Sequence, residues 1–392
     1  MDFYQRAREL KDETVANRRH IHTNAEVGLE LPKTVAFVME KLTEYGLEPR
    51  ECGHGVTCTL GSGEPVIMLR ADMDALPMPE ESGEPFACPD GKTAHACGHD
   101  FHASMLLTAA RMLKENEAEL KGTVKFMFQP AEETFEGAKD MICAGILEDP
   151  KPDVALAYHV AAGKMPVGIY MYNDKSTMMY SVDGFKIVVH GKGSHGAYPQ
   201  NSIDPINVAV HIYQALEAII AREVDATKAA IMTIGHFEAG AAANIIPDTA
   251  MLEGTIRSND KGAREVMVRR MHEVAEKTAE AFGATAEVIT LSDVAPLICD
   301  GELTREVVGY MQELSIPGAM PYPGIEASAS EDFATIAEKI PSTFMYLSAG
   351  YPDERGAYGA HNPKVQFNED VCEQGPAYLA HCAVRWLESH QA

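Results

Sequence analysis

The segment Val66-Ile-Met-Leu-Arg-Ala-Asp-Met-Asp74 begins as an apolar run and ends in two carboxylates. Two more apolar runs follow, at Val124–Phe128 and Val154–Ala157, and the segment Ser104–Lys114, with apolar residues on one helical side, separates the first run from the second. Short apolar runs that are rich in branched or aromatic residues are typical of buried strands. Strand–helix–strand units of this length predict a mostly parallel sheet that is covered by helices.

Helical patterns precede this region, and a different order of elements follows it. Apolar spacing predicts helices over Phe3–His22 and Pro32–Tyr45. From Asp183 onward the order becomes β-α-β-β-α-β, which is that of a ferredoxin-like domain. The expected segments are strand Phe185–His190, helix Asp204–Arg222, strands Ala230–Phe237 and Ala250–Arg257, helix Asp260–Phe282 and strand Thr285–Thr290.

The ferredoxin-like region is predicted to be an insertion, because helix and strand units resume after Pro296. We therefore expect an α/β protein in which residues 1–182 and 294–392 form one domain around the mostly parallel sheet. Residues 183–293 are expected to form a second, α+β domain inserted between them.

Composition restricts the kinds of partner that this chain can bind. The 392 residues include 33 Lys and Arg against 58 Asp and Glu, which gives a net charge of −25. Such an excess of negative charge disfavours nucleic acids and anionic membrane surfaces as partners. No segment approaches ~20 consecutive apolar residues, the N-terminus lacks the apolar core of a secretory signal, and the eight cysteines include no Cys-x-x-Cys pair. We therefore expect a cytoplasmic protein with reduced thiols that binds neither nucleic acid nor membrane.

Polar side chains follow each of the three predicted strands. The first strand leads into Asp72 and Asp74, the second into Gln129-Pro-Ala-Glu-Glu133, and the third into His159. Open parallel sheets bind their ligands outside the carboxyl ends of the strands. If the three strands share one sheet, these carboxylates and this imidazole meet at one edge.

The densest group of metal-binding residue types is His95-Ala-Cys-Gly-His-Asp-Phe-His102. Thiolate and imidazole are good ligands for divalent ions such as Zn²⁺. Cys97 and His99 are two residues apart, so in an extended chain their side chains would point the same way. The alternative is a histidine-rich loop in which Asp100 caps the following helix. The carboxylates and the imidazole at the strand ends favour a metal site.

The adjacent glutamates Glu132 and Glu133 fit such a site as well. Neighbouring glutamates usually mark a solvated surface, but these follow an apolar strand and the sequence Gln-Pro-Ala. Beside a metal ion, one carboxylate can be a ligand while the other acts as general base toward a water molecule.

A series of short motifs extends over nearly the whole chain. In order, they are Arg18-Arg-His-Ile-His22, Gly28-Leu-Glu30, RADMDALP from Arg70, HACGHDFH from His95, QPAEE from Gln129, GSHGAYP from Gly193, NIIPD from Asn244, GTIR from Gly254, SEDF from Ser330 and HNP from His361. This ordered set resembles the M20 metallopeptidase family, in particular its amidohydrolase branch of hippurate hydrolases, N-acyl-amino-acid deacylases and auxin-conjugate hydrolases.

The resemblance implies a metallopeptidase catalytic domain with an inserted lid or dimerisation domain, and two divalent metal ions. Zn²⁺ or Mn²⁺ is expected, with Co²⁺ and Ni²⁺ as alternatives. The implied ligands are Cys97, His99, Glu133, His159 and His361. Glu132 would be the general base, and Asp74 would orient a ligating imidazole. Asp72 takes the place of a ligand histidine of other M20 branches and is not expected to be a ligand here. Histidines beside a metal motif can orient the ligands, but roles at helix ends or in the core are expected for His20, His22, His95 and His102.

In the inserted domain, the resemblance implies that His195 and Asn244 reach the scissile carbonyl and that Arg257 reaches a substrate carboxylate. The sequence departs from the branch in Thr134-Phe-Glu136 and in Ala161-Ala-Gly-Lys164. Both departures lie near the expected pocket, which leaves the identity of the substrate open.

We therefore expect metal-dependent hydrolysis of an N-acyl-L-amino acid to a carboxylic acid and a free amino acid, by a homodimer or homotetramer. A dipeptidase of the same fold is the first alternative, because a peptide is also an N-acyl amino acid. A non-catalytic binding protein is the second, but all five ligand positions and Glu132 are filled. The acyl group, the preferred amino acid and the native metal stay open, as does the question of whether His195 acts in its own or a partner subunit's site.

Overall fold

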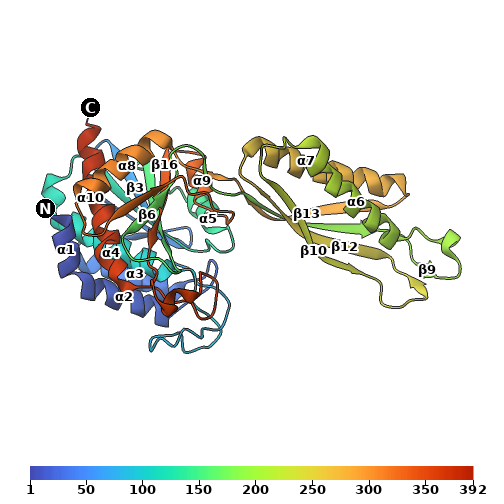
Figure 1. Ribbon diagram of the computed structural model, residues 1–392, viewed down its shortest axis with the longest axis horizontal. Coiled ribbons are helices and arrows are strands. Elements are labelled where there is room, and N and C mark those ends of the chain that lie inside the picture. The colour runs from blue at the N-terminus through green and yellow to red at the C-terminus, as the bar shows by residue number, and fades with distance from the viewer. Residues whose placement is uncertain (392) are drawn as a thin grey trace. The chain divides into compact units, whose positions relative to one another are not determined.

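The computed structural model describes residues 1–391, and the chain divides into two compact units (Figure 1). The larger unit comprises Met1–Met178, Ile298–Ile325 and the described residues from Asp332 onward. The smaller unit comprises Met179–Leu297 and Glu326–Glu331. The roles expected for these two parts of the chain, catalytic domain and lid, remain predictions.

An eight-stranded sheet forms the centre of the larger unit, with the strand order β1-β2-β4-β3-β5-β16-β6-β15. The bounds are β1 Arg50–Cys52, β2 Gly55–Gly61, β3 Val66–Asp72, β4 Thr123–Gln129, β5 Val154–Ala161, β6 Ile169–Tyr172, β15 Met320–Pro323 and β16 Ser342–Ser348. β3 pairs in parallel with β4 and β5, and β5 pairs in parallel with β16. The prediction of an α/β fold with a mostly parallel sheet is confirmed. Every residue of β3 and of β4 is buried, as expected for strands that are covered on both faces.

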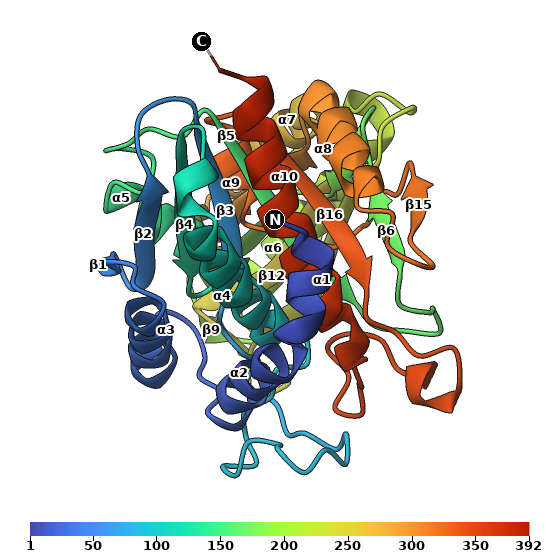
Figure 2. The same ribbon diagram turned by 90° about the vertical axis from the view of Figure 1, so that its left-hand side faces the viewer.

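Helices cover both faces of this sheet (Figures 1 and 2): α4 and α10 lie against one face, and α5 and α9 lie against the other. The helices of the larger unit are α1 Phe3–Glu9, α2 Lys11–Thr23, α3 Pro32–Glu44, α4 His99–Glu115, α5 Gly137–Cys143, α8 Gly301–Glu313, α9 Ala334–Ala337 and α10 Gly375–Ser389. Short 3-10 turns occur at Glu117–Glu119, Glu354–Ala357 and Glu369–Glu373. No helix among residues 1–391 is both long and apolar enough to span a membrane.

The smaller unit has the predicted order β-α-β-β-α-β around a four-stranded antiparallel sheet, β10-β12-β8-β13. Helices α6 and α7 pack against one face of this sheet (Figure 1). The bounds are β8 Val182–His190, α6 Pro205–Glu223, β10 Ala230–Ala239, β12 Thr249–Ser258, α7 Lys261–Ala281 and β13 Thr285–Val294. A small ladder of β9 Ser194–His195 and β11 Ile245–Ile246 is added, with a 3-10 turn at Pro199–Asn201, and β7 Thr177–Met179 and β14 Leu297–Ile298 lie where the chain passes from one unit to the other.

The central helix α4 begins at His99 instead of Ser104, and this changes the expected geometry of the histidine-rich segment. Its N-cap is Gly98, which has a left-handed φ of 96° and makes no side-chain capping bond. A Cβ at this position would lie 2.4 Å from a methyl carbon of Val160, so both the backbone angle and the crowding require glycine. The left-handed Gly98 turns the chain directly into the helix. The predictions of an extended Cys97–His99 segment and of Asp100 as the helix cap are therefore wrong.

The expected single helix over Phe3–His22 is two helices that meet at Leu10. α1 packs mainly against α10, while α2 packs mainly against α4. The break at Leu10 lets α1 align with α10 and α2 align with α4. Apolar spacing alone does not reveal such a break.

Candidate metal centre

The carboxyl ends of β3, β4 and β5 lie at the same edge of the sheet, as the sequence predicts. β3 is followed by Asp74, β4 by Glu132 and Glu133, and β5 carries His159 near its end. The connection from β3 leads to β4 on one side, and the connection from β4 leads to β5 on the other side. Such a reversal of strand order opens a crevice where parallel sheets bind their ligands.

His361 reaches this edge from a loop in the last part of the chain. Its backbone N–H donates a hydrogen bond of 2.9 Å to the carbonyl of Ala96, which ties the loop to the segment before Cys97. His361 has a φ of 63°, a left-handed conformation that is uncommon for a residue with a side chain. Strained backbone of this kind is often found at functional sites.

Cys97 lies between two groups of potential metal ligands. Its Sγ is 3.4 Å from Nε2 of His159 and 3.3 Å from Nε2 of His361. One group comprises Cys97, His99 and His159, the other comprises Cys97, Glu133 and His361, and the ligand atoms within each group lie within 4.8 Å of one another. The structure thus brings all five predicted ligands together, with the thiol shared by both groups.

His99 provides the observation that tests whether this cluster fits a metal ion. Its Nδ1 is 3.2 Å from a carboxylate oxygen of Asp74, while its buried Nε2 has no hydrogen-bond partner. That nitrogen lies 3.9 Å from a carboxylate oxygen of Glu132 and 3.9 Å from one of Glu133. A buried nitrogen without a partner, facing carboxylates across a gap of this width, is what a divalent cation would satisfy. The donor set of sulfur, nitrogen and oxygen fits such an ion.

The pKa values of Cys97, His99 and His159 also show how the cluster would respond to a cation. Burial raises the pKa of the Cys97 thiol to about 12, so without a cation the sulfur stays protonated at neutral pH. Burial lowers the pKa of the His99 imidazole, but the neighbouring Asp72 and Cys97 outweigh burial and raise it well above its ordinary value. Burial and the neighbouring His102 lower the pKa of His159 well below its usual range, which keeps this imidazole neutral, as a ligand must be.

Glu132 and Asp74 each face one ring nitrogen of His99. Glu132 is only 5% exposed and faces His99. The backbone N–H of Glu133 donates to one oxygen of Asp74 at 3.1 Å, and the other oxygen of Asp74 faces His99. Asp74 therefore links the loop after β4 to the first residue of α4.

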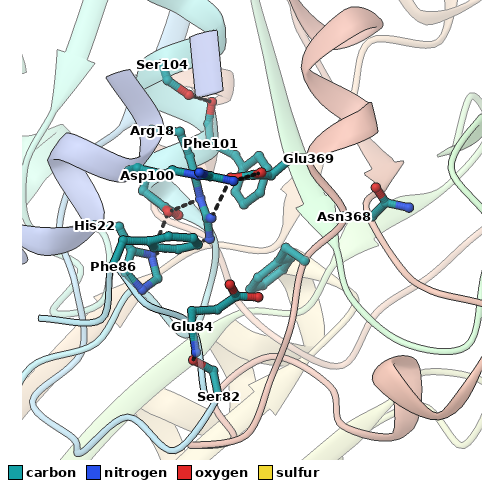
Figure 3. Close-up of polar contacts among 12 residues, drawn as sticks. Arg18, His22, Ser82, Glu84, Phe86, Asp100, Phe101, Ser104, Asn368 and Glu369 are labelled. Atoms are coloured by element: carbon teal, nitrogen blue, oxygen red, sulfur yellow. Dashed lines mark hydrogen bonds and ion pairs between the residues drawn. The ribbon is translucent and has the colours of Figure 1, made fainter. Parts of the chain in front are cut away.

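Behind this centre lies a buried network that the sequence reasoning missed (Figure 3). Arg18 Nε donates to an oxygen of Asp100 at 2.7 Å, and Arg18 Nη1 donates to Glu369 at 3.0 Å. Nδ1 of His22 lies 2.8 Å from the same oxygen of Asp100. Arg18, His22 and Asp100 are each at most 4% exposed.

Two aromatic rings enclose the guanidinium of this network (Figure 3), with centroids 4.6 Å away for Phe86 and 4.3 Å away for Phe101. Because Asp100 follows His99 on α4, the network anchors the first turn of α4 to α2. The sequence carried a partial signal, since Arg18 and His22 are four residues apart and share one side of a helix. Nothing local, however, pairs them with Asp100.

The other three histidines that the sequence assigned to helix ends or the core have different surroundings. His20 stacks on Phe37 with the ring centroids 4.0 Å apart. His95 is buried, and neither of its ring nitrogens has a hydrogen-bond partner among the described residues. His102 is buried against Asp72 and belongs to the surroundings of His159. His99 and His102 are three residues apart, so on a helix they lie on the same side. A sequence prediction that started α4 at His99 would have placed the two rings together.

The three predicted substrate-binding residues of the smaller unit do not lie together. Pairing of β9 with β11 places His195 opposite Ile245, and the carbonyl of Asn244 accepts a hydrogen bond of 2.8 Å from Gly196. These residues precede β12, whereas Arg257 lies near its end. From Thr249 to Arg257 the strand extends roughly 26 Å at 3.3 Å per residue. The structure joins His195 to Asn244 and separates both from Arg257 by the length of a strand.

Comparison with known proteins identifies relatives over nearly the full length of the chain. The model of peptidase family M20/M25/M40 matches residues 68–385. An N-acetyl-L-cysteine deacetylase of Bacillus subtilis is 35% identical over 97% of this chain and 90% of its own. Thermostable carboxypeptidase 1 of Saccharolobus solfataricus is 35% identical over 97% and 96%, and the hippurate hydrolase of Campylobacter jejuni is 33% identical over 97% and 98%.

A solved structure agrees with these relatives. The crystal structure of the Bacillus subtilis protein YXEP, described as a dinuclear metal-binding peptidase of the M20 family, has a TM-score of 0.80 to this chain. It is 32% identical, and the match covers 97% of this chain and 99% of that one.

Bound metal should protect Cys97 from alkylation. A thiolate that ligates a cation is not available to iodoacetamide, and chelation frees it. Because burial raises the pKa of the free thiol to about 12, its labelling after chelation should be slow at pH 7 and faster as the pH rises. The exposed Cys143 is the internal control and should react equally in both states. Peptide mass spectrometry measures both sites, and equal labelling of Cys97 with and without metal would contradict its role as a ligand.

Protonation of His22 should stabilise the fold up to alkaline pH. Burial disfavours the imidazolium, but Asp100 and Glu80 outweigh burial and raise the pKa of His22 to about 9. The unfolded value is ~6.5, so the stabilisation is complete below about pH 6.5, is lost as the pH rises through the folded value, and amounts to roughly 3 kcal/mol. Urea midpoints between pH 6 and 10 should therefore fall more steeply for the wild type than for His22→Asn. His20→Asn, the same change two residues earlier on α2, should behave as the wild type does. Parallel curves for the wild type and His22→Asn would contradict this assignment.

Proposed function

The chain belongs to peptidase family M20/M25/M40 and is an amidohydrolase of that family, and we propose that it hydrolyses the amide bond of N-acyl-L-amino acids, releasing a carboxylic acid and a free amino acid. The observation that carries this proposal is the cluster around Cys97, in which two ligand groups share a thiol and Glu132 lies beside them. The eight cysteines are all free thiols, which supports a reducing, cytoplasmic location.

The ligand set suits two divalent cations. A shared thiolate with imidazoles favours Zn²⁺, and the carboxylate of Glu133 also admits Mn²⁺, with Co²⁺ and Ni²⁺ as further alternatives. We assign Cys97, His99 and His159 to one ion and Cys97, Glu133 and His361 to the other. When bound, the ions would polarise the amide carbonyl and lower the pKa of a nearby water molecule.

Glu132 performs the proton transfers in this proposal. Its carboxylate is buried and faces His99 across the cluster, so it can reach a water molecule held there. Glu132 removes a proton from that water as the water attacks the amide carbon. It then returns the proton to the nitrogen of the leaving amino acid.

His195 is suited to donate a hydrogen bond to the oxyanion. The backbone N–H of Ala197 donates to Nδ1 of His195 at 3.1 Å, so the proton of the neutral imidazole is on Nε2. His195 is exposed, and its Nε2–H is the donor that remains. Asn244, held next to it by the β9–β11 ladder, would supply the second contact to the same carbonyl.

Arg257 is the proposed site for the substrate carboxylate. Its guanidinium is half-buried and donates from Nη1 to the carbonyl of Ile256 at 3.2 Å. A guanidinium can bind a carboxylate through two parallel hydrogen bonds, which a strongly acidic chain needs in order to hold an anionic substrate.

The separation of His195 from Arg257 favours a site to which two copies of the chain contribute. A small N-acyl amino acid is much shorter than the roughly 26 Å that β12 extends between the two ends. One copy of the smaller unit therefore cannot bind both ends of one substrate molecule. We propose a homodimer, alone or within a tetramer, in which His195 and Asn244 come from the partner of the chain that supplies Arg257.

A carboxypeptidase or dipeptidase activity of the same site is the second candidate. It is favoured by the similarity to the Saccharolobus carboxypeptidase, since a peptide is an N-acyl amino acid whose acyl group is another residue. The two candidates use the same cluster and differ only in the acyl group that the site accepts.

A release assay on metal-stripped protein reloaded with Zn²⁺, Mn²⁺, Co²⁺ or Ni²⁺ tests the proposal. N-acetyl and N-benzoyl amino acids should release free amino acid faster than dipeptides with the same C-terminal residue. Faster cleavage of the dipeptides would favour the second candidate, and no cleavage of either class with any metal would contradict both.

Glu132→Gln should retain its metal and its fold but lose ~10²–10⁴-fold in kcat, because general acid–base catalysis is worth about that much. Glu119→Gln is the control, since Glu119 is an exposed glutamate of the same unit. Metal analysis and circular dichroism accompany the kinetics. Turnover close to the wild type at full metal content would show that Glu132 is not the base.

Mixed dimers of Glu132→Gln and His195→Ala test the contribution of the partner. If His195 acts in the partner's site, one of the two sites in each mixed dimer contains both functional residues. Two variants that are each inactive, when co-expressed with random pairing, should then regain about a quarter of the wild-type sites. No recovery in a mixture that contains mixed dimers by native mass spectrometry would place His195 in its own chain's site.

A further inference from the structure

The sheet opens next to the proposed ligand His159. β3 and β5 pair from Ile67 and Val154 up to Arg70 and Ala157, and the ladder between them ends there. β5 continues to Ala161, while Ala71 and Asp72 of β3 pair only with β4. Backbone donors on this side of the last residues of β5 therefore need partners other than β3.

His102 of α4 fills this opening. The backbone N–H of Val160 donates to Nε2 of His102 at 2.8 Å, and Nδ1 of His102 contacts a carboxylate oxygen of Asp72. The other oxygen of Asp72 accepts from Arg70 Nη1 at 2.7 Å. His102 and Asp72 are 2% and 0% exposed, so these contacts are shielded from water.

The contacts determine the tautomer of His102. A backbone N–H can only donate, so Nε2 of His102 has to be the unprotonated acceptor. The proton of the neutral ring is then on Nδ1, from which it donates to Asp72. A doubly protonated ring would place an N–H against the N–H of Val160.

Val160, which donates to His102, also determines the orientation of the His159 ring. Nδ1 of His159 lies 2.7 Å from the carbonyl of Val160, so Nδ1 carries the proton and Nε2 faces Cys97 at 3.4 Å. The rings of His102 and His159 are 4.4 Å apart between centroids. The N–H of Val160 that donates to His102 and the carbonyl of Val160 that holds His159 flank the same Cα, so a shift of Val160 would move both contacts.

We propose that His102, held by Asp72, is a positioning residue for His159: it replaces the missing strand pairing at Val160 and thereby aims Nε2 of His159 into the metal centre. This inference rests on the ligand role proposed for His159. Groups that orient ligating histidines typically contribute 10–100-fold to metal affinity. The inference also gives a role to Asp72, which the sequence excluded as a ligand.

Asp72, His99 and His102 also lie close enough to be ligands of one ion. The contacts favour the positioning role, because both ring nitrogens of His102 and both oxygens of Asp72 are already engaged. An ion bound by His102 at this place would have to displace either its contact with Asp72 or the bond from Val160. The experiment distinguishes the two arrangements.

The first measurement is the tautomer in the unmodified, metal-free protein. Long-range ¹H–¹⁵N spectra of histidine-labelled protein, with His102→Phe to assign the signal, should show a neutral ring protonated on Nδ1. A ring protonated on Nε2, or on both nitrogens at pH 7, would overturn the proposal. This result does not depend on any activity of the enzyme.

The second measurement is metal affinity by chelator competition, together with the visible spectrum of the Co²⁺-loaded protein. His102→Phe should weaken one of the two bound ions by 10–100-fold and alter the Co²⁺ spectrum. His102→Gln, whose amide can both accept from Val160 and donate to Asp72, should recover most of the affinity. His381→Phe makes the same change on α10, away from the cluster, and should leave affinity and spectrum unchanged.

Unchanged affinity and spectrum in a folded His102→Phe protein would overturn the proposal. Loss of a whole ion in both His102 variants would instead indicate that His102 is itself a ligand. If His102→Phe does not fold, the tautomer of His102 in the unmodified protein and the metal affinity of His102→Gln test the proposal. Failure of the proposed activity on N-acyl amino acids would leave these binding results standing, so the two hypotheses are tested separately.

Discussion

Negative charge buried at the carboxyl edge of the sheet is the constraint on which the larger unit depends. Removing a carboxylate from water costs several kcal/mol unless a cation and hydrogen bonds compensate it. Arg70 provides this compensation inside the sheet: Nη1 donates to Asp72 at 2.7 Å and Nη2 to Asp332 at 3.1 Å. Gln129 completes the arrangement, since it accepts from Arg70 and donates to Asp332. Arg18 does the same for Asp100 on the other side of α4.

The carboxylates that lie near Cys97 at this edge are compensated by other groups. There the charges are balanced by imidazoles: Glu133 lies 3.2 Å from Nε2 of His361 and raises its pKa, and Asp72 and Asp74 raise that of His99 despite burial. Imidazolium groups are replaceable, because a divalent cation provides the same positive charge and leaves the rings neutral as ligands. The frame thus relies on permanent guanidinium charges, to which His22 adds a titratable one at Asp100, whereas imidazoles surround the centre.

The sequence predicts the strands and the polar residues at their carboxyl ends, because those features are local. An apolar run that leads into carboxylates or an imidazole marks a buried strand and its carboxyl end, and Asp74, Glu132, Glu133 and His159 all follow this pattern. It fails where one residue changes the backbone: the left-handed Gly98 starts α4 early, so His99, Asp100 and His102 are helical and face different neighbours. Contacts between distant segments, such as Arg18 with Asp100, leave no local trace.

The smaller unit shows why the exposure of a side chain such as Arg257 depends on the register of the strand as well as on its sequence. Ala250, Leu252, Gly254, Ile256 and Ser258 are the buried positions of β12, and alternate residues of a strand point to opposite faces. Because α6 and α7 pack against the face with the buried positions, Arg257 must lie on the face that they leave uncovered. A guanidinium there stays partly exposed, whereas one residue earlier or later it would be buried beneath a helix. The residue types of GTIR identify the arginine, but only the register makes it accessible, and only the length of β12 separates it from His195.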